Sequence, residues 1–214
     1  MARIWPFVAL LLAAAAGVAL GIGGYRQLRT ADESLSLTME QFERPRPVPQ
    51  VALTDHQGRP FGRDQLLGHW TLLFAGYSYC PDVCPTTLAQ LAGIYGELTE
   101  AVPGLQVVML SVDPARDGDG RLASYVPAFH PQFVGVSGPH PQLLQLTRAI
   151  GLVYAMVDDP GGSERYLVDH SASLVVIDPQ GQALGRFAPS TQVGTTGLFD
   201  SQQLLRELPL LANR

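Results

Sequence analysis

An apolar run, a loop with two cysteines and a helical repeat follow one another within residues 69–98, and this succession restricts the fold more than any other feature. HWTLLFAGYS, residues 69–78, is a mostly apolar run of strand length. PTTLAQLAGIYGEL, residues 85–98, repeats apolar side chains at helical spacing. Between them lie Cys80 and Cys84, the only cysteines of the chain. In an α/β sheet, sites gather where strands end and loops enter helices, so the pair is expected to mark a site.

Strand and helix patterns alternate along the rest of the chain. Further strands are expected in 105–113, 133–138 and, as hairpins, in 51–61 and 171–188; further helices are expected in 120–129, 141–154 and 201–212. This order predicts a mixed central sheet flanked by helices, in the α/β class. A cysteine pair between the first long strand and the first long helix is the arrangement of the thioredoxin-like fold.

The chain begins with a segment of different character. Residues 5–25 are apolar and uncharged, with Arg3 before them and Arg26 after them, and about 20 such residues cross a bilayer. We therefore expect an N-terminal transmembrane helix within residues 1–29, with a cleaved signal peptide as the competing interpretation. Residues 30–47 are polar and then proline-broken, which predicts an extended linker, and residues 48–214 form the folded domain.

Charge excludes one class of partner. The chain has 14 basic residues, all arginine, and 19 acidic residues without blocks, for a net charge of −5. A nucleic-acid-binding protein needs a basic surface, so nucleic acid is not expected as a partner. Nothing in the sequence indicates an oligomer, and we expect a monomer.

Four explanations compete for the cysteine pair. A structural disulfide would close a loop of only about five residues and stabilise the fold by only about 2 kcal/mol. A catalytic dithiol usually has two intervening residues, whereas this pair has three. Zinc would call for four ligands, usually with a second cysteine or histidine pair. Copper is satisfied by two thiolates and one imidazole. Pro85 is expected at the first helical position, which would hold both sulfurs near the positive end of the helix.

Five histidines are candidates for a third ligand: His56, His69, His130, His140 and His170. His170 stands out because it is at the end of the loop before the strand in SASLVVID. In a thioredoxin-like fold, the start of that strand lies beside the loop that carries the cysteine pair. Asp169, next to it, is expected to orient the imidazole or to face a partner.

The segments TDHQGRPF, GYSYCPDVCPTTLAQL, VVMLSVDPARD and YLVDHSASLVVIDPQG occur in this order between residues 54 and 181. Together they resemble the Sco/SenC copper proteins, which are associated with assembly of cytochrome c oxidase. The resemblance implies copper ligands at Cys80, Cys84 and His170. It also implies supporting roles for Asp82, Asp113 and Asp169.

The resemblance implies a membrane-anchored copper metallochaperone rather than an enzyme. Its domain would lie outside the bacterial cytoplasmic membrane. It would bind one copper, as Cu(I) or Cu(II), and deliver it to an oxidase subunit, subunit II in our prediction, after a thiol reductant has opened the redox-active Cys80–Cys84 pair. The alternative is an exported thiol-disulfide oxidoreductase or redox sensor. His170 discriminates between them, because dithiol exchange does not need it.

Overall fold

The computed structural model of the chain describes residues 37–118, 120–157, 166–189 and 199–213, together with Gly17 and Gly21. The chain divides into two units, Met1–Thr38 and Met39–Arg214, and nearly all described residues belong to the second. Within the described residues, no helix is both long enough and apolar enough to cross a membrane. The expected anchor at residues 1–29 falls outside them, apart from the two glycines, and stays a prediction.

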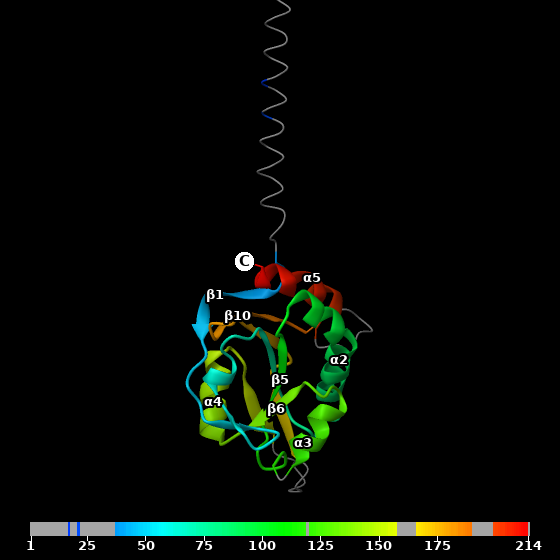
Figure 1. Cartoon of the computed structure of the whole chain (residues 1–214). Coiled ribbons are helices and arrows are strands. Elements are labelled where there is room, and N and C mark those ends of the chain that lie inside the picture. Colours follow the sequence, from blue (N-terminus) through cyan, green and yellow to red (C-terminus); the bar gives the residue numbers. More distant parts are fainter. Residues whose placement is uncertain are drawn as a thin grey trace, which may run out of the picture. The chain divides into compact units, whose positions relative to one another are not determined.

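The second unit is built on an eight-stranded mixed sheet (Figure 1). Its strands, in spatial order, are β1 (Glu40–Pro47), β10 (Gln182–Phe187), β9 (Leu174–Ile177), β4 (Thr71–Gly76), β5 (Gln106–Ser111), β6 (Val134–Ser137), β2 (Leu53–Asp55) and β3 (Pro60–Phe61). The central strands β4, β5 and β6 run parallel, and the remaining neighbours pair antiparallel. The predicted hairpins β2–β3 and β9–β10 are confirmed.

Helices flank this sheet. They are α2 (Val83–Ala101), α3 (Arg121–Tyr125), α4 (His140–Ala149) and α5 (Ser201–Ala212), with short 3-10 turns at Arg63–Gln65 and Val126–Ala128. Figure 1 shows α2 and α4 on opposite sides of the strands. The mixed sheet with helices on both sides confirms the expected α/β class.

The side chains of β4 are buried on both faces of the sheet. Successive side chains of a strand point to opposite faces, so each face has its own apolar layer. Leu73 of β4 belongs to one buried cluster with Leu143 and Leu146 of α4. Its neighbours Leu72 and Phe74 are also buried and point to the other face, the one on the side of α2. The helix α2 buries Leu88, Leu91, Tyr95 and Leu98, which is the helical spacing predicted for this segment.

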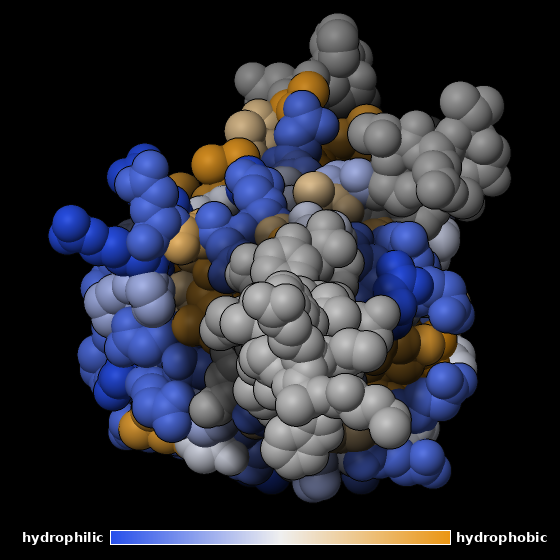
Figure 2. Space-filling view, turned by 90° about the horizontal axis from the view of Figure 1, so that it is seen from above, coloured by the Kyte–Doolittle hydropathy of each residue, from blue (hydrophilic) through white to orange (hydrophobic). Residues whose placement is uncertain are grey.

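The coloured surface in Figure 2 is mainly hydrophilic, with hydrophobic residues in small separate groups. No broad apolar patch is therefore visible on this face among the described residues. This agrees with the apolar side chains of the sheet being covered by helices.

The paths of residues 40–47 and 150–157 differ from the sequence-based expectation. Residues 40–47, predicted within a linker, form β1 and pair with β10, where Arg186 bonds to Glu40. The helix predicted for 141–154 ends at Ala149, because Gly151 adopts a φ of 79° that turns the chain. The chain then enters β7 (Tyr154–Val157), which pairs with β8 (Leu167–His170) in a separate two-stranded sheet.

Candidate metal centre

The cysteine loop connects β4 to α2. The helix begins at Val83 with Asp82 as its N-cap residue, so Cys84 and Pro85 occupy the second and third helical positions. The prediction that Pro85 opens the helix was therefore wrong by two residues. A proline is still tolerated there, since the first four amides of a helix have no partner within it. One of these amides, that of Cys84, donates to Cys80 Sγ at 3.5 Å.

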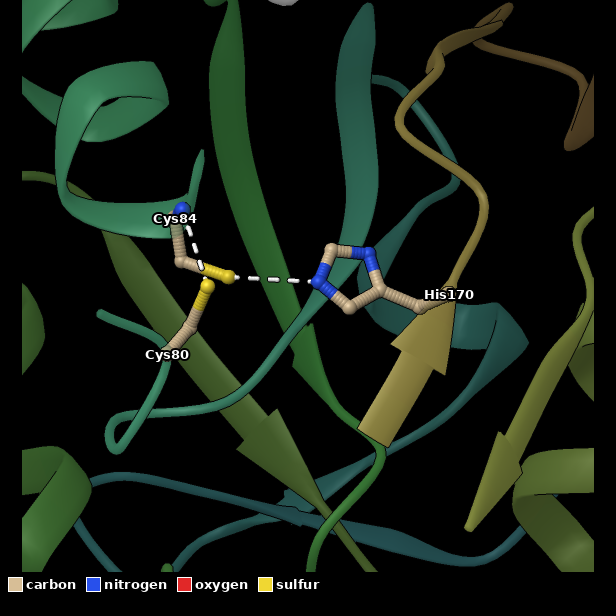
Figure 3. A group of neighbouring side chains, drawn as sticks. All are labelled: Cys80, Cys84 and His170. Carbon is tan, nitrogen blue, oxygen red and sulfur yellow. Dashed lines mark hydrogen bonds between the residues drawn. The ribbon is translucent and has the colours of Figure 1, made fainter. Parts of the chain in front are cut away.

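His170 reaches the same point from a distant part of the chain. It is the last residue of β8, paired in register with Tyr154, and not part of a loop as expected. Its Nε2 lies 3.5 Å from Cys84 Sγ. Figure 3 shows the imidazole and the two thiols pointing toward one another, with Cys84 at the start of its helix and His170 at the tip of its strand.

The three side chains fit a single soft metal ion. One ligand atom from each of Cys80, Cys84 and His170 lies within 4.8 Å of the others. Atoms this close can be bridged by one ion, since metal–sulfur bonds are about 2.3 Å long and metal–nitrogen bonds about 2.0 Å. Among the described residues, no other histidine, cysteine or acid joins this group. Two sulfurs and one nitrogen suit copper better than zinc, which usually takes four protein ligands in a closed site.

The hydrogen bond of the imidazole leaves its Nε2 atom available as a metal ligand. His170 Nδ1 lies 3.3 Å from the carbonyl oxygen of Ser171, so a proton on Nδ1 can be donated to that oxygen. This tautomer leaves the lone pair of Nε2 free on the side of Cys84. The ring of Tyr77 meets the imidazole edge-on, with 6.0 Å between centroids.

The two thiols differ in acidity. The thiol of Cys84 donates to Cys80, and this bond, aided by the backbone amides of Asp82 and Cys84, lowers the pKa of Cys80 to about 3 against the effect of burial. The same bond, together with deep burial, raises the pKa of Cys84 above its usual range. The metal-free, reduced site therefore holds one thiolate and one thiol. No disulfide joins the two cysteines in the structure.

The three aspartates expected to support the site have different surroundings. Asp82 is exposed at the start of α2, where its carbonyl oxygen accepts from Thr86 Oγ1 at 2.8 Å. Asp113 is fully buried and bonds to Arg116 and Tyr166. Asp169 is exposed next to His170 on β8, so its side chain points to the opposite face. The imidazole contacts the Ser171 carbonyl instead, which leaves Asp169 available to face a partner.

The sequence-based reasoning missed Asp117, which anchors the loop before Cys80. Its buried carboxylate accepts from the backbone amide and hydroxyl of Ser78 and from the hydroxyl of Ser111. The bonds to the two hydroxyls are 2.5 Å long, which ties the loop to the end of β5. The available signal was the second acid in the segment VVMLSVDPARD, six residues after the strand ends at Ser111.

The remaining histidines lie away from the cluster. His56 Nδ1 accepts from the amide of Gly135, and His69 Nδ1 lies 3.1 Å from the carbonyl oxygen of Gly104. His130 packs against Tyr95, and His140 contacts the hydroxyl of Tyr154. Of the five candidates, the structure thus brings only His170 to the cysteines.

Known proteins share this sequence and fold. A mitochondrial SCO2 homolog of Bos taurus is 34% identical over 182 residues, which cover 80% of this chain and 66% of the bovine protein. A Thermus thermophilus Sco1 solution structure, in the apo form, has a TM-score of 0.66 at 34% identity and covers 81% of this chain and 95% of that one.

A crystal structure of Arabidopsis thaliana ScoI with copper bound has a TM-score of 0.63 at 27% identity, over 76% of this chain and 98% of that one. These neighbours support the predicted thioredoxin-like fold. The SCO1/SenC family model matches residues 40–197, which include both cysteines and His170. The chain belongs to the SCO1/SenC family.

Proposed function

We propose that this protein is a copper metallochaperone that binds one copper ion through Cys80, Cys84 and His170. The observation that carries the proposal is the convergence of two sulfurs and one imidazole nitrogen within 4.8 Å. Soft thiolates select copper in its Cu(I) state, and the imidazole also suits Cu(II). The copper held by the Arabidopsis thaliana relative supports the same choice of metal.

The arrangement suits a metal that is passed on. Cys84 is fully buried, whereas Cys80 and His170 are half-buried and border the solvent. An incoming ligand from a partner can thus replace the accessible donors in turn while Cys84 still holds the ion. The recipient in our proposal is the copper-accepting subunit of cytochrome c oxidase, subunit II, and the protein is anchored by residues 5–25 in the bacterial cytoplasmic membrane with its domain outside.

Reduction of the cysteine pair precedes metal capture in this proposal. A disulfide between Cys80 and Cys84 would remove both thiolates, so a thiol reductant is required as a second partner. In that exchange the thiolate of the reductant attacks one sulfur of the disulfide and the other sulfur leaves as a thiolate; the low pKa of Cys80 makes it the better leaving group.

The experiment that tests the proposal compares cells that lack the protein with cells that carry the wild-type or the His170→Ala chain. We expect loss of oxidase copper and activity in the first and third strains, with recovery when copper is added to the medium. Normal oxidase copper in the His170→Ala strain would contradict the proposal.

The second candidate is a thiol-disulfide oxidoreductase, and the different acidities of the two thiols favour it. Under this function, the His170→Ala chain would still reduce a disulfide substrate at the wild-type rate, and copper would be incidental. Measuring disulfide reduction by both purified chains, with and without one equivalent of Cu(I), separates the two functions.

A further inference from the structure

The strand that carries His170 is not part of the main sheet. Within the described part of the chain, β8 pairs only with β7, in the two-stranded sheet. The cysteine loop, in contrast, begins at the end of β4, a central strand of the eight-stranded sheet. His170 is followed by three residues and then by β9, which pairs with β4, so the chain itself holds the end of β8 near the cysteine loop. The start of β8, in contrast, is held to that loop by side-chain contacts.

Arg116 makes the most extensive of these contacts. Its Nη1 donates to the carbonyl oxygen of Tyr166 at 2.9 Å, one residue before β8 begins. Its guanidinium lies over the ring of Tyr166, 3.7 Å from the centroid. The same guanidinium also lies 5.4 Å from the ring centroid of Tyr77 and 5.3 Å from that of Tyr79, both in the cysteine loop. Arg116 thus contacts both the cysteine loop and Tyr166, the residue just before β8.

Asp113 fixes the orientation of this guanidinium. Its carboxylate is fully buried and forms an ion pair with Arg116 Nε, while its other oxygen accepts from the hydroxyl of Tyr166 at 2.6 Å. A second contact helps to hold the strand, since the amide of Val168 donates to the hydroxyl of Tyr77 at 3.4 Å. An arginine whose planar donors are directed by a buried carboxylate can maintain a defined geometry between two chain segments.

We infer that Arg116, oriented by Asp113, is a positioning residue for the metal centre: it holds the start of β8 against the cysteine loop and so sets where His170 Nε2 meets the two sulfurs. This inference rests on the proposed function, because it assigns Arg116 a role in the same copper site. Residues that orient metal ligands from outside typically change metal affinity about 10- to 100-fold when they are replaced.

A double-mutant cycle on the full chain tests the inference. Four proteins are compared, the wild type, Arg116→Gln, His170→Ala and the combination, by Cu(I) affinity in competition with a chelator and by the thiolate-to-Cu(II) absorption band. We expect Arg116→Gln to weaken Cu(I) binding about 10- to 100-fold and to change the band. In the His170→Ala background, we expect it to have no further effect, since Arg116 acts through the imidazole.

Two further variants control for loss of structure. Arg116→Gln leaves Asp113 as a buried, unpaired charge, so the Arg116→Gln/Asp113→Asn chain removes both charges and should show the same weakened copper binding. Arg186→Gln is the matched control, because Arg186 likewise bonds to one carboxylate, Glu40, and to one carbonyl, that of Gly151. We expect wild-type copper binding for this control.

Three results would overturn the inference. They are unchanged affinity and absorption in Arg116→Gln, an equal effect of Arg116→Gln with and without His170, and an equal loss in Arg186→Gln. Failure of the proposed function would look different, since the wild-type chain itself would then bind no copper. In that case, ¹⁵N NMR of the His170 imidazole in the metal-free chain still reports whether Arg116→Gln moves the ring away from Cys84.

Discussion

Gly76 lies directly against Cys84: a Cβ atom placed on Gly76 would come within 2.9 Å of Cys84 Sγ. The same atom would meet Met109 Cε and Phe74 Cε2 at 3.3 Å each. The last residue of β4 therefore has to be small for the buried sulfur to keep its place.

Gly76→Ala is expected to displace Cys84 and to weaken copper binding. Crowding of this kind in a packed core typically costs about 1–3 kcal/mol of the free energy of unfolding. Gly93 and Gly96 of α2 supply the control, since a Cβ at either meets nothing within 4 Å. Alanine there should leave copper affinity unchanged and stabilise the protein by about 0.5–1 kcal/mol. Chemical denaturation and Cu(I) competition measure both quantities. Wild-type affinity in Gly76→Ala would contradict the packing argument.

The low pKa of Cys80 predicts how alkylation of the metal-free, reduced protein depends on pH. A thiol with a lowered pKa stays ionised at pH values below the usual thiol pKa. Cys80 loses its charge only as the pH falls toward about 3. The rate of Cys80 alkylation by iodoacetamide, followed by mass spectrometry, should therefore be nearly constant between about pH 5 and 8. Cys84, whose pKa is raised, should react far more slowly.

The Cys84→Ala chain is the control for this pH profile, because the hydrogen bond from Cys84 is the largest cause of the lowered Cys80 pKa. In this chain, the alkylation rate of Cys80 should be lower at acid pH and should rise with pH. An unchanged profile would mean that the thiol–thiolate bond does not set the acidity of Cys80.

Replacement of either cysteine by serine should abolish high-affinity copper binding. A serine hydroxyl remains protonated at neutral pH and is a poor ligand for a soft metal, so each variant keeps only two of the three donors. Cu(I) competition on the Cys80→Ser and Cys84→Ser chains measures the loss. If either variant retained the wild-type affinity, the three-ligand site would be incorrect.

Asp117→Asn should destabilise the fold and loosen the loop that leads to Cys80. The two carboxylate oxygens share hydrogen bonds from the Ser78 amide and from the hydroxyls of Ser78 and Ser111, and asparagine keeps only one acceptor oxygen, so the bonds to the other oxygen are lost. We expect a loss of about 1–3 kcal/mol in the free energy of unfolding. Ser124→Ala is a suitable comparison, since Ser124 is exposed and bonds only within its own turn among the described contacts. Equal stability of Asp117→Asn and the wild type would contradict the anchoring role.

Much of the fold could be predicted from the sequence, because its strands and helices carry the expected spacing of apolar residues. The strand Thr71–Gly76 is buried throughout, and the inner face of α2 follows a helical repeat. The strand β1 escaped prediction, since Glu40–Pro47 is an exposed edge strand whose charges and prolines are also typical of a linker. The β7–β8 hairpin was missed because three of the four residues of β7 are exposed and show no alternation.

The candidate site was predicted in outline through its cysteines and one histidine. The contacts that hold it could not be predicted, because they join residues far apart in the chain. Arg116 and Tyr166 are separated by 50 residues, and Ser78 and Asp117 by 39. The spacing of residues within a single helix or strand does not reveal such pairs. The sequence placed Asp113 near the site without indicating that it orients an arginine.

X-ray absorption of the Cu(I)-loaded full chain, measured beside His170→Ala and His69→Ala, identifies the atoms bound to the metal. The wild type should show one copper with two sulfur ligands at about 2.3 Å and one nitrogen ligand at about 2.0 Å, taking typical metal–ligand bond lengths. The nitrogen should disappear in His170→Ala and persist in His69→Ala, because His69 lies outside the cluster. A copper environment that is the same in all three proteins would contradict the Cys80, Cys84 and His170 site.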